Sequence, residues 1–432
     1  MRHLLVLFFC SFFASISTNA QAPKKSSSAA IYHSLQKLNF LGTALYVAAH
    51  PDDENTRLIS YLSNNVKART GYLSLTRGDG GQNLIGPELR ELLGVLRTQE
   101  LLAARRVDGG EQFFTRANDF GYSKHPKETL EIWNKEVILE DVVRTIREFK
   151  PDIIINRFDH RSPGSTHGHH TSSAMLSLEA FDLANDSSSY PNQLETTETW
   201  QPKRLFFNTS WWFYGSEEKF EKADKSQMLN FDVGTYYPIL GLSNNEIASL
   251  ASSQHLCQGF GRLSSRGSQE EYVELLKGDL PNDRSDLFDG INTTWSRVKG
   301  GKDIGDILYE VESNFNFKNP TLHLQQLVKA YKLLQGIEDE HWKNLKSEEL
   351  KHLILSVSGI HLEAFSKTDY ANPGESISIT VEALNRAPST VVLKSVLINN
   401  KEVLKGEIDL KDNVLKTEEV NLSISENTEY TS

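Results

Sequence analysis

The sequence predicts an α/β protein: a Rossmann-like, mainly parallel sheet flanked by helices, then a helical segment and a small C-terminal β-sandwich-like module. Two apolar runs, at 43–49 and 151–156, are continuous rather than alternating, which is typical of strands buried on both faces. Segments with helical apolar spacing separate the strand candidates, which indicates βαβ units. After about Ile360, short strand candidates follow one another with turns between them.

Each element follows from its local pattern. Strands are expected at 43–49, 71–76, 151–156 and 204–209, and helices at about 58–66, 89–107, 133–149 and 174–181. The segment from 303 to 357 has helical spacing, and 376–381 and 390–394 have the composition of strands. Because ligands bind at the carboxyl ends of parallel strands, the polar residues directly after 43–49 and 151–156 are the candidate site.

The N-terminus has the pattern of a secretory signal peptide. Arg2 and His3 precede an apolar run at 4–14, and small residues follow around Ala20 and Ala22. This run is shorter than the roughly 20 residues that a membrane span needs. We therefore expect an exported protein, periplasmic or extracellular, that has no membrane span.

The net charge indicates which partners are disfavoured, and the sequence pattern indicates the domains. The chain of 432 residues has 46 Lys and Arg against 57 Asp and Glu, a net charge of −11, which disfavours a nucleic-acid partner. The expected organisation begins with a signal peptide at 1–22 and a linker and lead-in at 23–40. A catalytic domain at 41–300, a helical segment at 301–358 and a β-rich module at 359–432 follow. The last of these is short for a complete sandwich.

The first polar cluster directly follows the first strand. Residues 50–54 place one imidazole beside three carboxylates, His50 with Asp52, Asp53 and Glu54. Crowded carboxylates repel one another unless a cation offsets their charge. His50 and one aspartate can hold a divalent metal, while the other aspartate takes a proton from water. The alternative is an ordinary helix start in which Asp52 or Asp53 is the N-cap.

The second polar cluster follows the third predicted strand. Three histidines fall within four positions, and His167 and His170 share one face if this stretch is helical. A surface cluster without a role is the alternative. Because both clusters follow strands of one sheet, they can meet at one edge, where two histidines and one aspartate leave positions open for water and substrate. Such a set suits Zn²⁺, and Fe²⁺ is the other candidate.

These motifs resemble the PIG-L/LmbE-like de-N-acetylase family. The resemblance rests on Ala-His-Pro-Asp-Asp-Glu at 49–54, a later His-x-x-His at 167–170, and the intervening segments 76–83 and 93–101. It covers roughly residues 40–260. The family implies a Rossmann-like fold and hydrolysis of the amide in N-acetylglucosamine-type substrates.

The resemblance also implies roles for individual residues. The implied metal ligands are His50, Asp53 and His170. Asp52 is implied to be the general base, and His167 a second catalytic residue that stabilises the oxyanion or protonates the leaving amine. Arg97 is implied to lie near the substrate. Many members read His-Pro-Asp-His where this chain reads His-Gly-His-His, so His169 competes with His170 for the role of ligand.

The expected function is that of an exported, metal-dependent hydrolase that removes an N-acetyl group from an amino-sugar-type small molecule or glycan. One alternative is an amidase that acts on a thiol conjugate or a peptide. Another is a non-catalytic carbohydrate-binding protein, which would need no base such as Asp52 beside the metal. The four aromatic residues at 211–214 fit either stacking on a sugar or packing in the core.

Overall fold

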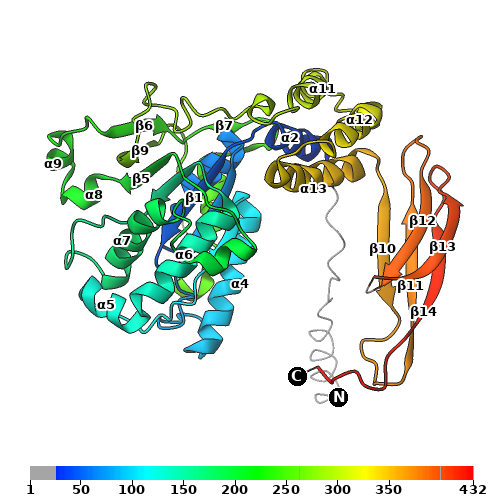
Figure 1. Ribbon diagram of the computed structural model, residues 1–432, viewed down its shortest axis with the longest axis horizontal. Helices are drawn as coiled ribbons and strands as arrows, with labels where there is room; N and C mark the ends of the chain where they lie inside the picture. Colours follow the sequence, from blue (N-terminus) through cyan, green and yellow to red (C-terminus); the bar gives the residue numbers. More distant parts are fainter. Residues whose placement is uncertain (1–25, 262, 399, 432) are drawn as a thin grey trace, which may run out of the picture.

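A seven-stranded sheet forms the centre of the molecule (Figure 1). The computed structural model describes residues 26–261, 263–398 and 400–431, so the predicted signal peptide at 1–22 lies outside the described residues. The strand order is β3-β2-β1-β4-β5-β9-β6. The bounds are β1 Thr43–Ala48, β2 Arg69–Ser74, β3 Glu111–Phe114, β4 Ile153–Asn156, β5 Arg204–Thr209, β6 Met228–Asp232 and β9 Glu270–Gly278.

Most of this sheet is parallel. Strands β3, β2, β1, β4 and β5 pair in parallel, whereas β9 runs antiparallel to both β5 and β6. The predicted α/β class with a mainly parallel sheet is therefore confirmed. The strand predicted at 204–209 coincides with β5, and those predicted at 71–76 and 151–156 overlap β2 and β4.

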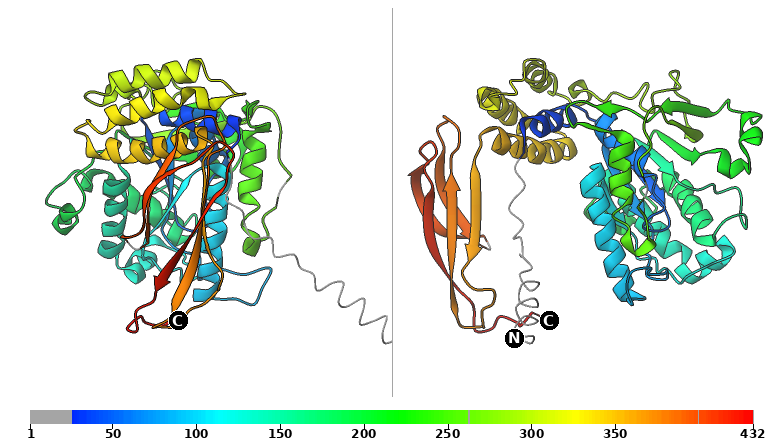
Figure 2. Two further views of the ribbon diagram at one scale, coloured as in Figure 1. Left: turned by 90° about the vertical axis from the view of Figure 1, so that its right-hand side faces the viewer. Right: turned by 180° about the vertical axis from the view of Figure 1, so that it is seen from behind.

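Strand β1 shows why the apolar runs form buried strands. All six of its residues are buried, and alternate side chains enter different cores. Tyr46 packs in a core with residues of α3 (Thr56–Ser60) and α4 (Glu91–Asp108). Val47 packs in a core with residues of α6 (Lys135–Phe149) and α7 (Gly168–Leu183). Helices α6 and α7 lie in front of the sheet in Figure 1, and α4 lies in front when the molecule is seen from behind in Figure 2.

The course of the chain creates a crevice between β1 and β4. From β1 the chain proceeds through β2 to the edge strand β3, and it then returns to β4 on the other side of β1. Connections therefore leave the carboxyl ends of these two neighbouring strands in opposite directions. Such a switch point is where ligands bind in open parallel sheets, and both polar clusters begin there.

Two predicted segments differ from the structure. The helix predicted at 133–149 is α6, which begins two residues later, while Trp133 ends a separate helix, α5 (Pro126–Trp133), because Asn134 between them has a left-handed φ of 57°. The lead-in predicted at 23–40 contains the helix α2 (Ser28–Leu38), which Ser27 caps by accepting a hydrogen bond from the backbone N–H of Ala30. Apolar residues at helical spacing make this segment more than a linker.

Helix α2 belongs to a helical layer with three helices from the other end of the chain. These are α11 (Lys302–Ser313), α12 (Leu324–Leu334) and α13 (Glu340–Val357). Ile31, Leu35 and Leu38 of α2 are buried in one core with residues of all three. In the described residues, no helix is both long enough and apolar enough to cross a bilayer.

The C-terminal region consists of antiparallel strands. Strands β10 (His361–Ser366), β11 (Ser376–Leu384) and β14 (Lys416–Ser423) form one sheet, and β12 (Val392–Ile398) pairs with β13 (Lys401–Asp409). Whether these sheets close into a sandwich stays a prediction, as do the domain boundaries. The other elements are α8 Trp211–Tyr214, α9 Glu217–Glu221, β7 Tyr236–Tyr237, β8 Leu242–Ser243, α10 Asn244–Ser252, a π-helix Tyr61–Val66 and short 3₁₀ turns at Pro191–Glu195, Leu256–Gln258, Trp295–Arg297 and Pro320–His323.

Candidate metal centre and substrate cleft

The first polar cluster forms a tight turn at the carboxyl end of β1. The Asp53 carboxylate accepts a hydrogen bond from the backbone N–H of His50 at 2.7 Å and lies 3.0 Å from its Nδ1. Helix α3 is capped by Asn55, whose side chain accepts from the backbone N–H of Arg57. The helix-start interpretation of Asp52 and Asp53 therefore does not hold, because another residue takes the capping role.

The second polar cluster begins helix α7 after β4. His167 is the N-cap residue, and its Nδ1 accepts from the backbone N–H of His169 at 3.1 Å. His170, in the first turn, stacks on Phe158 with ring centroids 3.8 Å apart and turns its Nε2 to within 3.4 Å of the Asp53 carboxylate. The rings of His167 and His170 lie 5.3 and 5.2 Å from that of His50. The fold therefore brings the two clusters together.

Two overlapping sets of side chains can hold a metal ion in the described part of the chain around this turn. Ligand atoms of His50, Asp53 and His170 lie within 4.8 Å of one another, and so do those of His50, His167 and His169. The first set supplies a charged donor: burial alone would raise the pKa of Asp53, but His170 and His50 outweigh burial and hold that pKa well below its ordinary value. Two imidazoles and one ionised carboxylate are ligands that Zn²⁺ prefers.

His169 is buried in the protein interior, where it contacts His50. It is fully buried, and its ring packs against Phe120 and Trp133 at 4.5 and 4.7 Å. Its Nδ1 lies 2.9 Å from Nε2 of His50, while Nδ1 of His50 faces Asp53. Burial lowers the pKa of His169 to about 2, so this ring is a neutral acceptor. Hydrogen bonding at Nε2 leaves Nδ1 of His50 as the nitrogen that can bind metal beside Asp53.

Asp52 is held apart from this set by Arg97. The backbone of Asp52 has φ of 100°, and its Oδ1 lies 2.9 Å from Nη2 of Arg97. Burial raises the pKa of Asp52 to about 7, although the Arg97 guanidinium opposes that rise. Arg97 itself is 3% exposed and donates to the carbonyl oxygens of Pro51 and Gly78. The structure thus places Arg97 under Asp52, and its predicted contact with substrate stays a prediction.

Gly78, in the segment 76–83, has a backbone conformation that lets this segment contact Arg97. Its φ is +70°, and an added Cβ would overlap the Arg97 guanidinium. The same guanidinium donates a hydrogen bond to the carbonyl oxygen of Gly78. A glycine at this position lets the loop after β2 close over Arg97. The segment therefore contributes to the site by backbone contact.

Glu54 links the turn to a buried ionic network. Its Oε2 accepts from the backbone N–H of Asp52 at 2.9 Å, and its Oε1 faces Arg105 at 3.2 Å and His255 at 2.8 Å. Arg105 also pairs with Asp108. Sequence reasoning missed this network. The spacing of Arg105 and Asp108 on α4 is a weak signal, but nothing local in the sequence connects His255 to Glu54.

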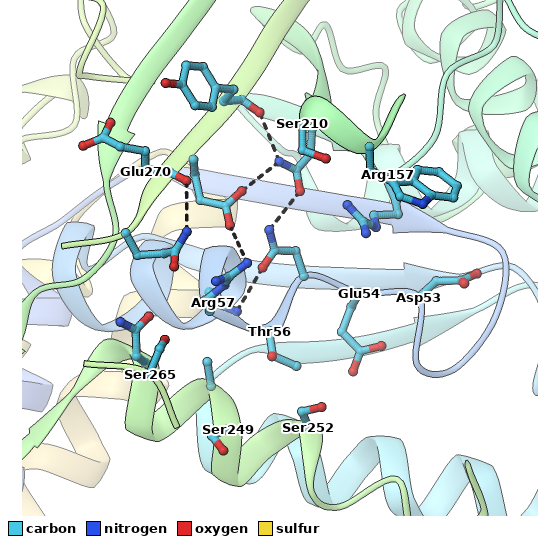
Figure 3. Close-up of a pocket in the computed structure, with 18 of the residues that line it drawn as sticks. Asp53, Glu54, Thr56, Arg57, Arg157, Ser210, Ser249, Ser252, Ser265 and Glu270 are labelled. Carbon is cyan, nitrogen blue, oxygen red and sulfur yellow. Dashed lines mark hydrogen bonds and ion pairs between the residues drawn. The ribbon is translucent and has the colours of Figure 1, made fainter. Parts of the chain in front are cut away.

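A cleft of about 660 Å³ opens beside Asp52 and Asp53 (Figure 3). Its lining combines amide and hydroxyl side chains, such as Asn208 and Ser210, with aromatic residues. Trp211 and Trp212 of α8 line it while 48% and 58% exposed. These two tryptophans are therefore not core residues, and stacking on a sugar stays a prediction for them.

Part of the chain matches a known protein family. The family model described as PIG-L, GlcNAc-PI de-N-acetylase, matches residues 45–181. Residues 45–181 are a PIG-L domain. All six predicted site residues lie within it, whereas His255 and most of the cleft lining lie outside.

Part of the chain is similar to a known deacetylase. A 1D-myo-inositol 2-acetamido-2-deoxy-alpha-D-glucopyranoside deacetylase from Kineococcus radiotolerans is 28% identical over 160 residues, which are 32% of this chain and 43% of that protein. The matched segment thus spans less than half of the relative's length.

Two solved structures are distantly similar. The N,N'-diacetylchitobiose deacetylase from Pyrococcus horikoshii is 17% identical over 38% of this chain and 59% of its own, with a TM-score of 0.32. A 4-carboxy-2-hydroxymuconate hydratase from Pseudomonas putida is 13% identical over 56% and 99%, with a TM-score of 0.37. These likenesses are too low to bear on activity.

Proposed function

We propose that the PIG-L domain is the catalytic part of a metal-dependent amide hydrolase that removes an N-acetyl group from an amino-sugar-type substrate. The observation that carries this proposal is the Asp52 carboxylate, held by Arg97 at the edge of a cleft, directly beside the converging side chains of His50, Asp53 and His170. The family description and the deacetylase relative support the type of reaction.

The donor set fits a divalent cation. Two imidazoles and one carboxylate leave coordination positions open, which suits Zn²⁺, and the same set accommodates Fe²⁺. When bound by His50, Asp53 and His170, the cation supplies the Lewis acidity that polarises an amide carbonyl.

Asp52 acts as the general base. A carboxylate with a pKa of about 7 accepts a proton efficiently near neutral pH. As a water oxygen bonds to the acyl carbon, Asp52 takes its proton. When the C–N bond breaks, the same proton passes to the amine nitrogen, which leaves as the free amine. The acyl group leaves as acetic acid, which ionises to acetate. Arg97 keeps the Asp52 carboxylate oriented during both transfers.

His167 stabilises charge on the former carbonyl oxygen. Burial lowers the pKa of His167 to about 4, and His50 and His170 add to this effect, so the ring is neutral at pH 7. A neutral ring can donate one hydrogen bond to an oxyanion but cannot begin the reaction as a charged acid. Both ring nitrogens accept backbone N–H groups in this structure, Nδ1 from His169 at 3.1 Å and Nε2 from Ser123 at 3.4 Å. Donation to an oxyanion therefore requires the ring proton on Nε2 and release of the longer contact with Ser123. Of the two predicted roles, the oxyanion role is the better supported.

Two further predictions belong to this proposal. An amide in a thiol conjugate or a peptide is the alternative substrate, because the chemistry at Asp52 would be the same. Export to the periplasm or the extracellular space is proposed from the N-terminal pattern alone.

The test is release of acetate from a panel of N-acetylated sugars. Mature protein is loaded with Zn²⁺, or with Fe²⁺ under anaerobic conditions, and compared with the Asp52→Ala variant. Acetate that appears only with metal and disappears in Asp52→Ala supports the proposal. Protein that holds metal but releases no acetate from any sugar contradicts the amino-sugar proposal and directs the search to other amides.

A further inference from the structure

Arg157 is the first residue after β4, at the carboxyl edge where the two polar clusters meet. It stands between Asn156, which is fully buried, and Phe158, whose ring stacks on His170. It lines the same cleft as Asp52 and Asp53. Figure 3 shows its side chain directed into this cleft, on the side of Ser210. The residue is thus fixed close to the reaction centre by the strand that it ends.

The guanidinium of Arg157 has no protein acceptor among the residues that the structure describes. The residue is of intermediate exposure, and its Cζ lies 5.9 Å from the ring centroids of both Phe158 and Phe213. The other arginine in the cleft, Arg57, faces Glu271 at 3.3 Å. Arg161, four residues further along the chain, pairs with Glu274 at 2.7 and 2.6 Å. Neighbouring arginines therefore have carboxylate partners, and Arg157 does not.

The unpaired state of Arg157 contrasts with the acidic groups around it. The Asp52 carboxylate pairs with Arg97, and the Asp53 carboxylate pairs with His50 and His170. Neither forms an ion pair with Arg157 among the described residues. An arginine remains charged at any ordinary pH and presents five N–H donors in one plane. The side-chain nitrogens of Arg157 are not among the buried atoms without a partner, so they are open to a ligand in the cleft. A carboxylate or phosphate can bind such a group with two parallel hydrogen bonds.

The remaining cleft lining suits a sugar. Trp211 and Trp212 are about half exposed and present flat apolar rings, on which sugar faces stack. Ser210 adds a hydroxyl group to the same lining, whereas the Asn208 amide is buried and already hydrogen-bonded to Tyr46, Asn55, Glu271 and Tyr272. The volume of about 660 Å³ is within the range of small-molecule sites and exceeds what an acetyl group alone requires.

We propose that Arg157 is a specificity-determining residue that binds a carboxylate or phosphate group on the substrate, so that the preferred substrates are acidic N-acetylated amino sugars rather than neutral ones. This inference rests on the proposed function, because it assumes that the acetyl group lies at Asp52 while the anionic group lies at Arg157. The two ends of the substrate then contact residues that follow the carboxyl ends of two neighbouring strands, β1 and β4.

The test measures binding and turnover with three probes. N-acetylmuramic acid carries a carboxylate, N-acetylglucosamine 6-phosphate carries a phosphate, and N-acetylglucosamine is neutral. Calorimetric titrations and acetate assays use the zinc-loaded protein, the variants Arg157→Gln and Arg157→Lys, and the control Arg161→Gln from the same loop. Titrations of metal-free protein separate binding at Arg157 from direct binding of the anion to zinc.

The expected result is that at least one acidic probe binds about tenfold or more tightly than the neutral sugar. Arg157→Gln should remove this preference, Arg157→Lys should retain part of it, and Arg161→Gln should leave it unchanged. The acidic probe that shows the effect distinguishes carboxylate from phosphate. A melting temperature close to that of the wild type establishes that Arg157→Gln is folded, and Arg157→Lys replaces it if it is not.

Other results overturn the inference. These are equal binding of acidic and neutral probes, no binding of either acidic probe, or a preference that survives Arg157→Gln. Failure of the proposed function looks different: an acidic probe binds in an Arg157-dependent way but releases no acetate. Conversely, equal acetate release from N-acetylglucosamine by wild type and Arg157→Gln, without acidic preference, retains the function and removes the role of Arg157.

Discussion

The two sides of the cleft differ in how their charges are satisfied. On the inner side, which we call the floor, Asp52, Asp53 and Glu54 each face a cation or an imidazole within 3.4 Å. On the outer side, which we call the wall, Arg157 faces no carboxylate among the described residues, and two tryptophans are about half exposed. Each carboxylate of the floor is paired before any ligand arrives, whereas the wall retains unused donors and apolar surface.

This difference separates two tasks. Groups that act on the reacting atoms work best when their neighbours already hold them in place, because no reorganisation is then needed during the reaction. Groups that recognise the rest of the substrate gain most when their partner is the substrate itself. The following changes either break the paired floor or sharpen its contrast with the wall.

The largest effect is expected for Asp52→Asn, which removes the base from the floor. Turnover should fall by about 10²- to 10⁴-fold. Metal content, measured by plasma emission spectrometry after dialysis, should remain unchanged because His50, Asp53 and His170 are intact. A loss of metal in Asp52→Asn would mean that the roles of Asp52 and Asp53 are exchanged.

A smaller but still large effect is expected for His170→Ala. Removing one of three protein ligands should weaken zinc binding by more than about 100-fold, measured by competition with a chromogenic chelator. His160→Ala changes a nearby histidine outside both candidate ligand sets and should bind zinc normally. If His160→Ala and His170→Ala behave alike, His170 is not a ligand.

His169→Ala should weaken zinc binding by about 10- to 100-fold, since His169 orients His50 without binding the metal. His169→Asp should restore much of the affinity, because a carboxylate can also accept the hydrogen bond from Nε2 of His50. Zinc binding that is abolished in both variants would instead make His169 a ligand, and the predicted register of the second cluster would be wrong by one residue.

Much of this arrangement could be predicted from the sequence, because it depends on local pattern. The apolar runs of β1 and β4 identify central strands, and polar residues that follow two neighbouring parallel strands must lie at one edge of the sheet. The convergence of His50 with His170 follows from that rule. Helix α5 was not predicted as a helix of its own, and only the backbone reveals that Asn134, with its left-handed conformation, separates it from α6.

Features that depend on pairing across the fold were not predictable. His255 lies 201 residues after Glu54 in the chain, so the ion pair between them is visible only in three dimensions. Likewise, the sequence shows that Arg157 exists but not that it has no acceptor. Helix α2 was missed because its buried residues pack against helices from beyond residue 300.

The smallest effect concerns the ionic network below the floor. Burial alone would lower the pKa of His255, but Glu54 outweighs burial and raises that pKa above its ordinary 6.5. Burial alone would raise the pKa of Glu54, but His255 and Arg105 hold it below its ordinary 4.5. The stabilisation from His255 is therefore fully present below pH 6.5 and is lost as pH rises through its folded pKa. That from Glu54 is present above pH 4.5 and is lost as pH falls through its folded pKa.

His255→Gln should accordingly reduce the free energy of unfolding by about 2 kcal/mol near pH 5.5, the contribution of a hydrogen bond to a charged group. The difference from wild type should shrink as pH rises well above 6.5. Urea denaturation of metal-free protein at several pH values measures it, with exposed His352→Gln as the control. A difference that is constant across this range would show that His255 contributes by packing and not by charge.

The position of the bound cation is the most direct measurement, because two overlapping sets of side chains compete for it. Anomalous X-ray scattering at the zinc absorption edge, from crystals of the zinc-loaded protein, locates the ion without reference to activity. We expect one peak at about 2.0–2.2 Å from a nitrogen of His50, a nitrogen of His170 and an oxygen of Asp53. A peak bound by His50, His167 and His169 would contradict the assignment of His167 and Asp52 to catalysis beside a His50–Asp53–His170 metal centre.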